Sequence, residues 1–155
     1  ADPSAALAPP PPLPALRAHI AAALDAMLAR GVVTARERAL MADDALASFF
    51  VSELGRRMLR SPLLYREQNF SVRLPDLGVP ALQGVVDVCF LEEGAWVVYD
   101  YKSAEHGATA RIAARYRPQV ALYRRALRDV TGVPVRECGL YLLDQQMAIR
   151  VESGA

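Results

Sequence analysis

Apolar residues recur at helical spacing through the first third of the chain. Between residues 15 and 30 they return every three or four positions until Gly31 ends the pattern, which is typical of an amphipathic helix. Thr34 and Glu37, three positions apart, form the capping-box pair that starts a helix. The pattern therefore predicts three helices: residues 15–30, a second helix that begins after Thr34, and a third from Asp43 or Asp44 to near Arg60.

After Pro62 the pattern changes to short segments rich in β-branched and aromatic residues, which favour strands. A long helical stretch interrupts them and is closed by Gly132 and Pro134. Turns are expected at residues 75–80 and at residues 92–94, the latter as the three-residue connection of a hairpin. The predicted elements are strands 65–74, 81–91 and 95–102, a helix at 109–130, and strands 137–143 and 147–151.

Composition places the chain among globular domains. Its 155 residues suit one domain, and no apolar run approaches the roughly 18 to 20 residues that span a membrane. Residues 1–14 are rich in Ala and Pro, which favours a linker or disordered tail. We expect a single domain at 15–155, with a helical part at 15–61 and an α/β core at 62–155. Since the chain starts without Met or a secretory pattern, we expect a piece of a longer cytoplasmic protein.

Charge and cysteine content narrow the chemistry. The net charge of +1 does not by itself indicate a nucleic-acid partner, so DNA contacts are expected only from local basic patches. Cys89 and Cys138 lie in apolar strand segments and are expected to be buried free thiols. Two thiols cannot supply the four thiolates of an iron–sulfur cluster, so no such cluster is expected.

Two acids and a lysine stand in otherwise apolar strands. Asp87 is flanked by valines, and Asp100 ends an apolar run two residues before Lys102. Because side chains alternate along a strand, Asp100 and Lys102 share a face while Tyr101 points away, and the hairpin brings Asp87 towards them. Unpaired charge in a buried strand is costly, so this trio is a candidate functional cluster.

Such a cluster suits hydrolysis of a phosphodiester bond. Carboxylates bind Mg²⁺ while the ion keeps several waters, and the metal polarises the phosphate and lowers the pKa of a bound water. Lys102 is expected to position that water or to offset transition-state charge, and the Tyr101 carbonyl to add an oxygen ligand. The alternative is a structural salt bridge from Lys102 to Asp87 or Asp100, but an Asp followed by Asp-X-Lys on one hairpin favours the functional interpretation.

Three segments resemble, in this order, the motifs of RecB-like nucleases of the PD-(D/E)XK superfamily: Gly84-Val-Val-Asp87, Val98-Tyr-Asp-Tyr-Lys-Ser103 and Gln119-Val-Ala-Leu-Tyr123. The likeness is greatest to the C-terminal nuclease domain of AddA, a helicase-nuclease protein, and covers about residues 16 to 150. It implies an α/β fold of the restriction-endonuclease type, with a central mixed β-sheet flanked by helices.

The resemblance assigns roles to the acids and the lysine. Asp87 and Asp100 correspond to metal-binding acids and Lys102 to the catalytic lysine. Glu67 corresponds to a further acid in the first strand, which binds the metal directly or through water. The alternative for Glu67 is an exposed strand residue paired with Arg66 or Arg73.

The long helix carries the expected DNA contacts. Gln119 and Tyr123 lie four residues apart on one helix face, and in the family this pair is associated with the active site and the DNA strand. The alternative is that Tyr123 faces the core with Gln119 at its rim. Arg115 belongs to a belt of six arginines that either follows a phosphate backbone or is a solvated face. The belt comprises Arg111, Arg115, Arg117, Arg124, Arg125 and Arg128.

One family feature is missing from the sequence. The family places a metal-binding His on a helix before these elements, usually after a Gly and a small residue, and this pattern does not occur. His19 is expected on a helix surface and His106 in a loop. We expect the corresponding His to lie outside this chain.

The expected function is that of an Mg²⁺- or Mn²⁺-dependent deoxyribonuclease. The AddA resemblance implies trimming of the 3′-ended strand in bacterial double-strand break repair, an ATP-dependent helicase region in the same parent chain, and a second, AddB-like subunit. One alternative is a non-catalytic DNA-binding or assembly module that lacks the upstream His. Another is a stand-alone RecB-like nuclease of a mobile-element or defence system, a type that usually carries a four-cysteine cluster.

Overall fold

The computed structural model describes residues 11–74, 78–103 and 107–151. Most of the predicted tail, half of the predicted turn at 75–80, and His106 therefore lie outside the described residues. The chain divides into two compact units, residues 1–60 and 61–155. No helix within the described ranges is long and apolar enough to cross a membrane.

The first unit is helical. Its helices are α1 (Leu13–Ala29), α2 (Ala35–Leu40), α3 (Asp43–Val51) and α4 (Glu53–Arg60), and α1 packs mainly against α3. The capping box before α2 is confirmed, because the Thr34 hydroxyl accepts from the Glu37 N–H while the Glu37 carboxylate accepts from the Thr34 N–H. Helix α1 begins two residues before its predicted start, since Pro14 lies in its first turn, where proline costs no hydrogen bond.

The prediction of one continuous helix at 43–60 is wrong. Ser52 separates α3 from α4 with an extended backbone, φ −64° and ψ 163°. Its hydroxyl donates to the Phe49 carbonyl and accepts from the Gly55 N–H, so it ends one helix and caps the next. Gly55 fits this corner because a Cβ there would overlap the Phe49 carbonyl. A serine that competes for backbone groups thus interrupts an otherwise regular apolar pattern.

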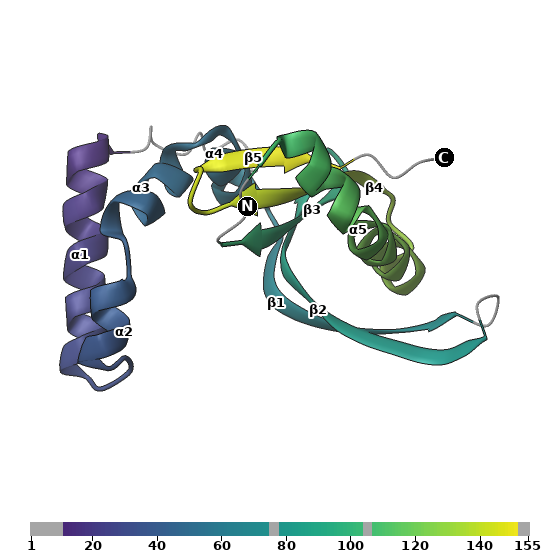
Figure 1. Ribbon diagram of the computed structural model, residues 1–155, viewed down its shortest axis with the longest axis horizontal. Coiled ribbons are helices and arrows are strands. Elements are labelled where there is room, and N and C mark those ends of the chain that lie inside the picture. Colours follow the sequence, from purple (N-terminus) through teal and green to yellow (C-terminus); the bar gives the residue numbers. More distant parts are fainter. Residues whose placement is uncertain (1–10, 75–77, 104–106, 152–155) are drawn as a thin grey trace. The chain divides into compact units, whose positions relative to one another are not determined.

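The second unit is a five-stranded mixed sheet, as predicted (Figure 1). Its elements are β1 (Leu64–Leu74), β2 (Val79–Glu92), β3 (Ala95–Lys102), α5 (Thr109–Thr131), β4 (Val135–Leu142) and β5 (Met147–Arg150). The strands lie in sequence order, and all neighbours are antiparallel except β3 and β4. Helix α5 connects that parallel pair, as a crossover must. Element ends differ from the predicted ones by one or two residues.

The connection between β2 and β3 has two residues, not three. Glu92 pairs with Ala95, so only Glu93 and Gly94 form the turn, and both have positive φ, 49° and 76°. Two such residues give the type I′ turn, whose twist matches that of the flanking strands. The prediction counted Glu92 as loop because a charged residue at a strand end is indistinguishable from a loop residue in the sequence alone.

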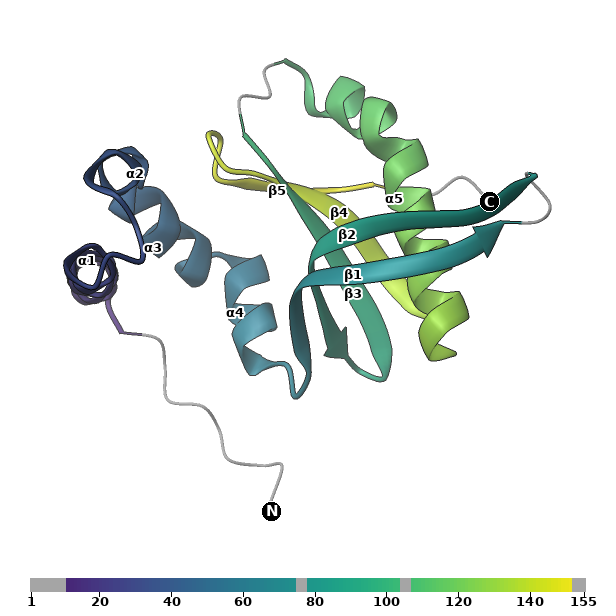
Figure 2. The same cartoon turned by 90° about the horizontal axis from the view of Figure 1, so that it is seen from below.

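Helix α5 covers one face of the sheet and forms the main core with it. Val98, Cys138 and Leu140 from the strands share this core with Val120 and Leu127 from the helix. Beyond its pairing with β3, the β1–β2 hairpin continues and curves alongside α5 (Figures 1 and 2). The active-site candidates lie on this helix-covered face.

Candidate active site

The sheet register brings the two acids together. Val88 pairs with Tyr99, and one step further along both strands places Asp87 across from Asp100. On its other side Asp100 pairs with Leu140, a residue of the core under α5. Lys102 follows two residues later on the same face. The three residues predicted from the sequence therefore converge beneath the first half of α5.

Asp100 is the buried centre of the cluster, with 4% of its surface exposed. Its Oδ2 lies 2.5 Å from the Lys102 ammonium, in an ion pair whose angles are not those of a hydrogen bond. Lys102 also lies over the Tyr116 ring, 4.6 Å from its centroid. A buried carboxylate is therefore balanced by an ammonium that is held on both sides.

Asp87 is half-buried beside Asp100, and its Oδ2 accepts a 2.8 Å hydrogen bond from the Tyr101 N–H. Burial raises the pKa of the Asp87 carboxyl, and the neighbouring Asp100 carboxylate raises it further. The Tyr101 N–H and the Lys102 ammonium oppose this shift without cancelling it. Two carboxylates share one ammonium, so the cluster has an excess of negative charge and favours a cation.

Helix α5 holds Asp100 from the opposite side. The Gln119 amide donates to the Tyr123 hydroxyl at 2.6 Å, and this hydroxyl donates to Asp100 Oδ1 at 3.2 Å. Burial, together with the Asp100 charge, raises the pKa of Tyr123 to about 12, so the phenol keeps its proton and remains a donor. Tyr123 is 8% exposed within the core, with Gln119 half-buried at its rim.

Glu67 lies across from Asp87, because its neighbours Arg66 and Gln68 pair with Val88 and Val86. Its backbone is in the left-handed region, φ 48°, which is rare for a non-glycine residue inside a strand. The side chain is exposed and is not gathered with the other two acids. Such backbone strain is typical of functional positions.

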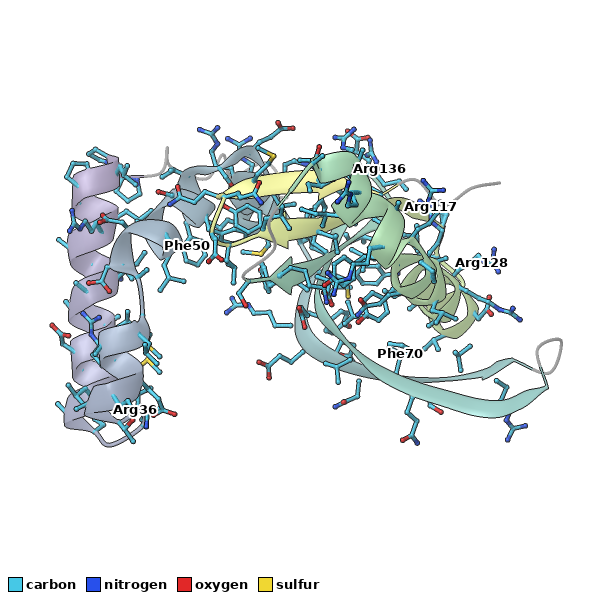
Figure 3. The ribbon with its side chains drawn as sticks, viewed as in Figure 1. Arg36, Phe50, Phe70, Arg117, Arg128 and Arg136 are labelled. Atoms are coloured by element: carbon cyan, nitrogen blue, oxygen red, sulfur yellow. The ribbon has the colours of Figure 1, made fainter. Side chains whose placement is uncertain are left out.

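Arg115 and its neighbours make the outer side of α5 basic. Arg115 is exposed and lies over the Tyr116 ring, 5.2 Å from its centroid. Figure 3 shows Arg117 and Arg128 along the same helix. Near the C-terminal end, Arg125 and Arg128 form ion pairs with Asp129. The arginines of the first half are those nearest in sequence to Gln119.

The other candidates from the sequence do not join the cluster. His19 is exposed on α1, in the first unit. Cys89 and Cys138 are buried free thiols, as predicted. Burial raises the pKa of Cys89 to about 11, so it is a poor nucleophile.

The residues present fit a hard divalent cation. Within the described ranges no group of three or more His, Cys, Asp or Glu side chains could hold one ion. Mg²⁺ needs no such cage, because it commonly binds through one or two carboxylates and keeps its waters. Asp87 and Asp100 supply two carboxylates, and the buried Asp100 Oδ2 lacks a hydrogen bond that would occupy it. Asp87 and Asp100 would therefore hold the ion.

Sequence reasoning missed two aromatic members of the site. Tyr116 lies beside Lys102, and Phe70 packs edge-on against Tyr123 with ring centroids 5.7 Å apart. Tyr116 lies seven residues before Tyr123 and so shares its helix face, which was a usable signal. No local pattern identifies Phe70, because its contact depends on how the β1–β2 hairpin curves.

Comparison with known proteins gives relatives of one kind. The chain is 37% identical over 128 residues to an AddA-type ATP-dependent helicase/nuclease of Geobacillus thermodenitrificans, which covers 70% of this chain. Proteins of the same name from Syntrophomonas wolfei and Alkaliphilus metalliredigens are 35% and 33% identical and cover 83% and 85% of it. The expected resemblance to AddA is thereby confirmed. The chain spans only 10 to 12% of the length of these relatives.

A family model provides the second comparison. The model of the PD-(D/E)XK nuclease superfamily matches residues 5–152, a range that includes Asp87, Asp100 and Lys102. The mixed sheet, with its two acids and lysine on one hairpin, agrees with that match. The chain therefore belongs to the PD-(D/E)XK nuclease superfamily.

Proposed function

We propose that this chain is the nuclease part of a bacterial helicase-nuclease and hydrolyses DNA phosphodiester bonds with Mg²⁺ or Mn²⁺. The observation that carries the proposal is the buried Asp100 carboxylate, which has Asp87 across the hairpin and the Lys102 ammonium against it. A cluster with this charge, at the end of two strands, suits a divalent cation and a phosphate together.

Each residue has a distinct part. Asp87 and Asp100 hold the cation, which when bound polarises the phosphate and lowers the pKa of a water. Lys102 donates from its ammonium to a phosphate oxygen or to the attacking water, and so offsets the charge that develops there. Tyr123 keeps Asp100 oriented, and Gln119 keeps Tyr123 oriented. Glu67, across from Asp87, contacts the cation through water or directly once its exposed side chain turns inward.

The first half of α5 binds the DNA backbone. Arg115 is exposed there and offers several donors to phosphate oxygens. Gln119 lies at the rim of the site, where its amide is within reach of the bound strand. The buried Tyr123 has little ring area available for stacking, so its part is to orient Asp100.

The parent protein follows from the relatives. We propose an ATP-dependent helicase region in the same chain, a second AddB-like subunit, cutting of the 3′-ended strand during break repair, and a bacterial cytoplasmic location. The names of the relatives, each an ATP-dependent helicase/nuclease, support this context. Release of nucleotides from DNA labelled at one end or the other tests the polarity.

A nuclease assay with Mn²⁺ tests the activity. We expect Asp100→Asn to lower the cleavage rate by at least about a hundredfold, because the amide cannot balance Lys102 or hold the cation. Asp144→Asn, in the exposed turn between β4 and β5, is the matched control and should cut like the wild type. If the unaltered chain binds DNA but does not cut it, or if Asp100→Asn cuts normally, the enzymatic proposal fails.

A further inference from the structure

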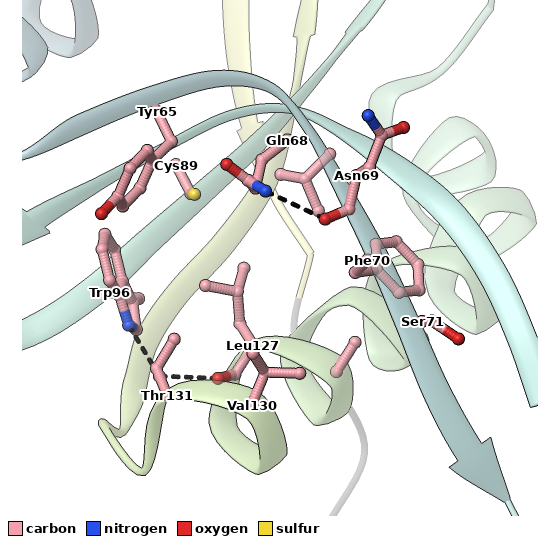
Figure 4. Close-up of a pocket in the computed structure, with 12 residues that line it drawn as sticks. Tyr65, Gln68, Asn69, Phe70, Ser71, Cys89, Trp96, Leu127, Val130 and Thr131 are labelled. Carbon is pink, nitrogen blue, oxygen red and sulfur yellow. Dashed lines mark hydrogen bonds between the residues drawn. The ribbon is translucent and has the colours of Figure 1, made fainter.

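A cavity of about 350 Å³ lies between α5 and the strands β1 to β3 (Figure 4). Strand side chains form one wall and the C-terminal half of α5 forms the other. All of its lining belongs to the second unit. Its lining residues are Tyr65, Gln68, Asn69, Phe70, Ser71, Val86, Cys89, Trp96, Ala126, Leu127, Val130 and Thr131.

The cavity has an apolar floor and a polar, aromatic rim. Val86, Trp96 and Leu127 are buried in the floor. The rim carries the amides of Gln68 and Asn69 and the ring of Tyr65, which is 41% exposed. The Tyr65 and Trp96 rings lie 5.8 Å apart and inclined at 43°, so Tyr65 stands as a flat surface at the mouth.

The chemistry of the lining selects the kind of ligand. None of the described lining residues is an Asp, Glu, Lys or Arg, so no phosphate or metal ion is drawn inside. Apolar walls suit a flat uncharged ring, and rim amides both donate and accept, as the edge of a nucleobase requires. The volume lies at the low end of the range for small-molecule sites, roughly 300 to 1,000 Å³. One base fits that description.

The cavity adjoins the carboxylate cluster. Glu67, across from Asp87, separates the rim residues Tyr65 and Gln68 in the sequence, and two strand residues span roughly 7 Å. Phe70 lines the cavity and packs against Tyr123, whose hydroxyl donates to Asp100. A nucleotide next to a phosphate held at Asp87 and Asp100 is therefore close enough to place its base here.

We propose that this cavity receives one unstacked base of a single DNA strand, next to the phosphate that is cut. The inference rests on the proposed nuclease function and specifies its substrate as a strand whose base is free to leave the stack. Tyr65 stacks on the entering base, and Gln68 and Asn69 bond its edge. A paired duplex base cannot enter without opening its pair.

The single tryptophan of the chain reports on the cavity directly. Trp96 lies in its floor, with its indole N–H donated to Thr131 Oγ1 at 3.0 Å. The fluorescence of the full chain is titrated with a single-stranded oligonucleotide and with an abasic strand of equal length, both in EDTA so that nothing is cut. We expect the first strand to change Trp96 emission and to bind about tenfold more tightly than the abasic strand.

Variants assign the effect to the rim. Tyr65→Ala should remove most of the tenfold preference and leave affinity for the abasic strand unchanged, while Tyr65→Phe, which keeps the ring, should retain it. Gln68→Ala should weaken base-bearing strands alone. Gln83→Ala is its matched control, because Gln83 is an exposed glutamine of the same hairpin that does not line this cavity. Circular dichroism checks that each variant is folded.

The outcomes separate the two proposals. If the chain binds and cuts DNA but prefers neither strand, or if Tyr65→Ala keeps the preference, the base site is overturned and the nuclease stands. If neither strand binds and no DNA is cut, the proposed function fails and the base site fails with it. A change in Trp96 emission with the abasic strand alone also overturns the base site.

Discussion

At the scale of single residues, the site is organised around the cost of burying one carboxylate. Asp100 has an ammonium at one oxygen and a phenol at the other, and each of these groups is itself held in place. Lys102 lies over an aromatic ring, and Tyr123 accepts from Gln119. Removing any member leaves a buried polar group without its partner, so these interactions are coupled and their effects should not add.

Asp87 is destabilising when charged, which makes its removal a test. Because its folded-state pKa is raised, the folded chain holds the proton more tightly than the unfolded chain, and stability falls as pH rises through the folded pKa. In EDTA at pH 7, Asp87→Asn should therefore unfold at a higher temperature than the wild type. With half of the group solvent-screened, the gain is about 0.5 kcal/mol, or about 1–2 °C.

Differential scanning calorimetry measures this gain. At pH 3 the wild-type Asp87 is largely protonated in both states, so the difference should nearly close. Asp144→Asn, which removes an exposed acid, should show no gain at either pH. An Asp87→Asn variant that is no more stable than the wild type at pH 7 would contradict the prediction. It is expected to be inactive in any case, since it loses a cation ligand.

The sequence allowed prediction of the residues that break a local rule. Asp87, Asp100 and Lys102 are charged residues within apolar strands, so pattern alone marked them, and strand alternation placed them on one face. Tyr116 and Phe70 break no rule, because an aromatic residue in a helix or strand is normally core. Their roles depend on packing between elements, which is set by the curvature of the hairpin and the position of α5.

At the scale of elements, periodicity predicted each helix and strand but not every interruption. The division at Ser52 and the short turn at Glu93 and Gly94 both depend on backbone hydrogen bonds, which an apolar pattern does not encode. The turn also carries a cost, because Glu93 adopts φ 49° without being Gly or Asn. This local conflict between residue and conformation is testable.

Glu93→Asn should stabilise the hairpin by about 0.5 kcal/mol, because Asn tolerates the left-handed region of a type I′ turn. The loss of the exposed ion pair with Arg136 offsets little of this gain. Urea unfolding measures the change. Glu93→Gln is the control, since it removes the same charge but keeps the unfavourable backbone, and it should be neutral or slightly destabilising. Equal stabilisation by both variants would show that charge is responsible.

At the scale of the whole molecule, a net charge of +1 gives little attraction for DNA. Binding must then depend on where the charges lie. Arg111 and Arg115 continue the line of Gln119 and Tyr123 towards the start of α5 in steps of four residues, and both are exposed. Arg125 and Arg128, at the other end, are already paired with Asp129. Only the first half of α5 is expected to follow the phosphate backbone.

The salt dependence of binding tests this asymmetry. For single-stranded DNA the slope of log K against log salt falls by about 0.7 for each phosphate that the protein no longer neutralises, so Arg111→Gln with Arg115→Gln should reduce it by about 1.4. Arg125→Gln with Arg128→Gln removes the same charge and should change the slope much less, because those guanidinium groups are committed to Asp129. Affinity is measured in EDTA between about 50 and 200 mM salt, as is usual for such slopes. An equal reduction by both pairs would mean that DNA responds to the total charge of the helix and not to a track that leads into the carboxylate cluster.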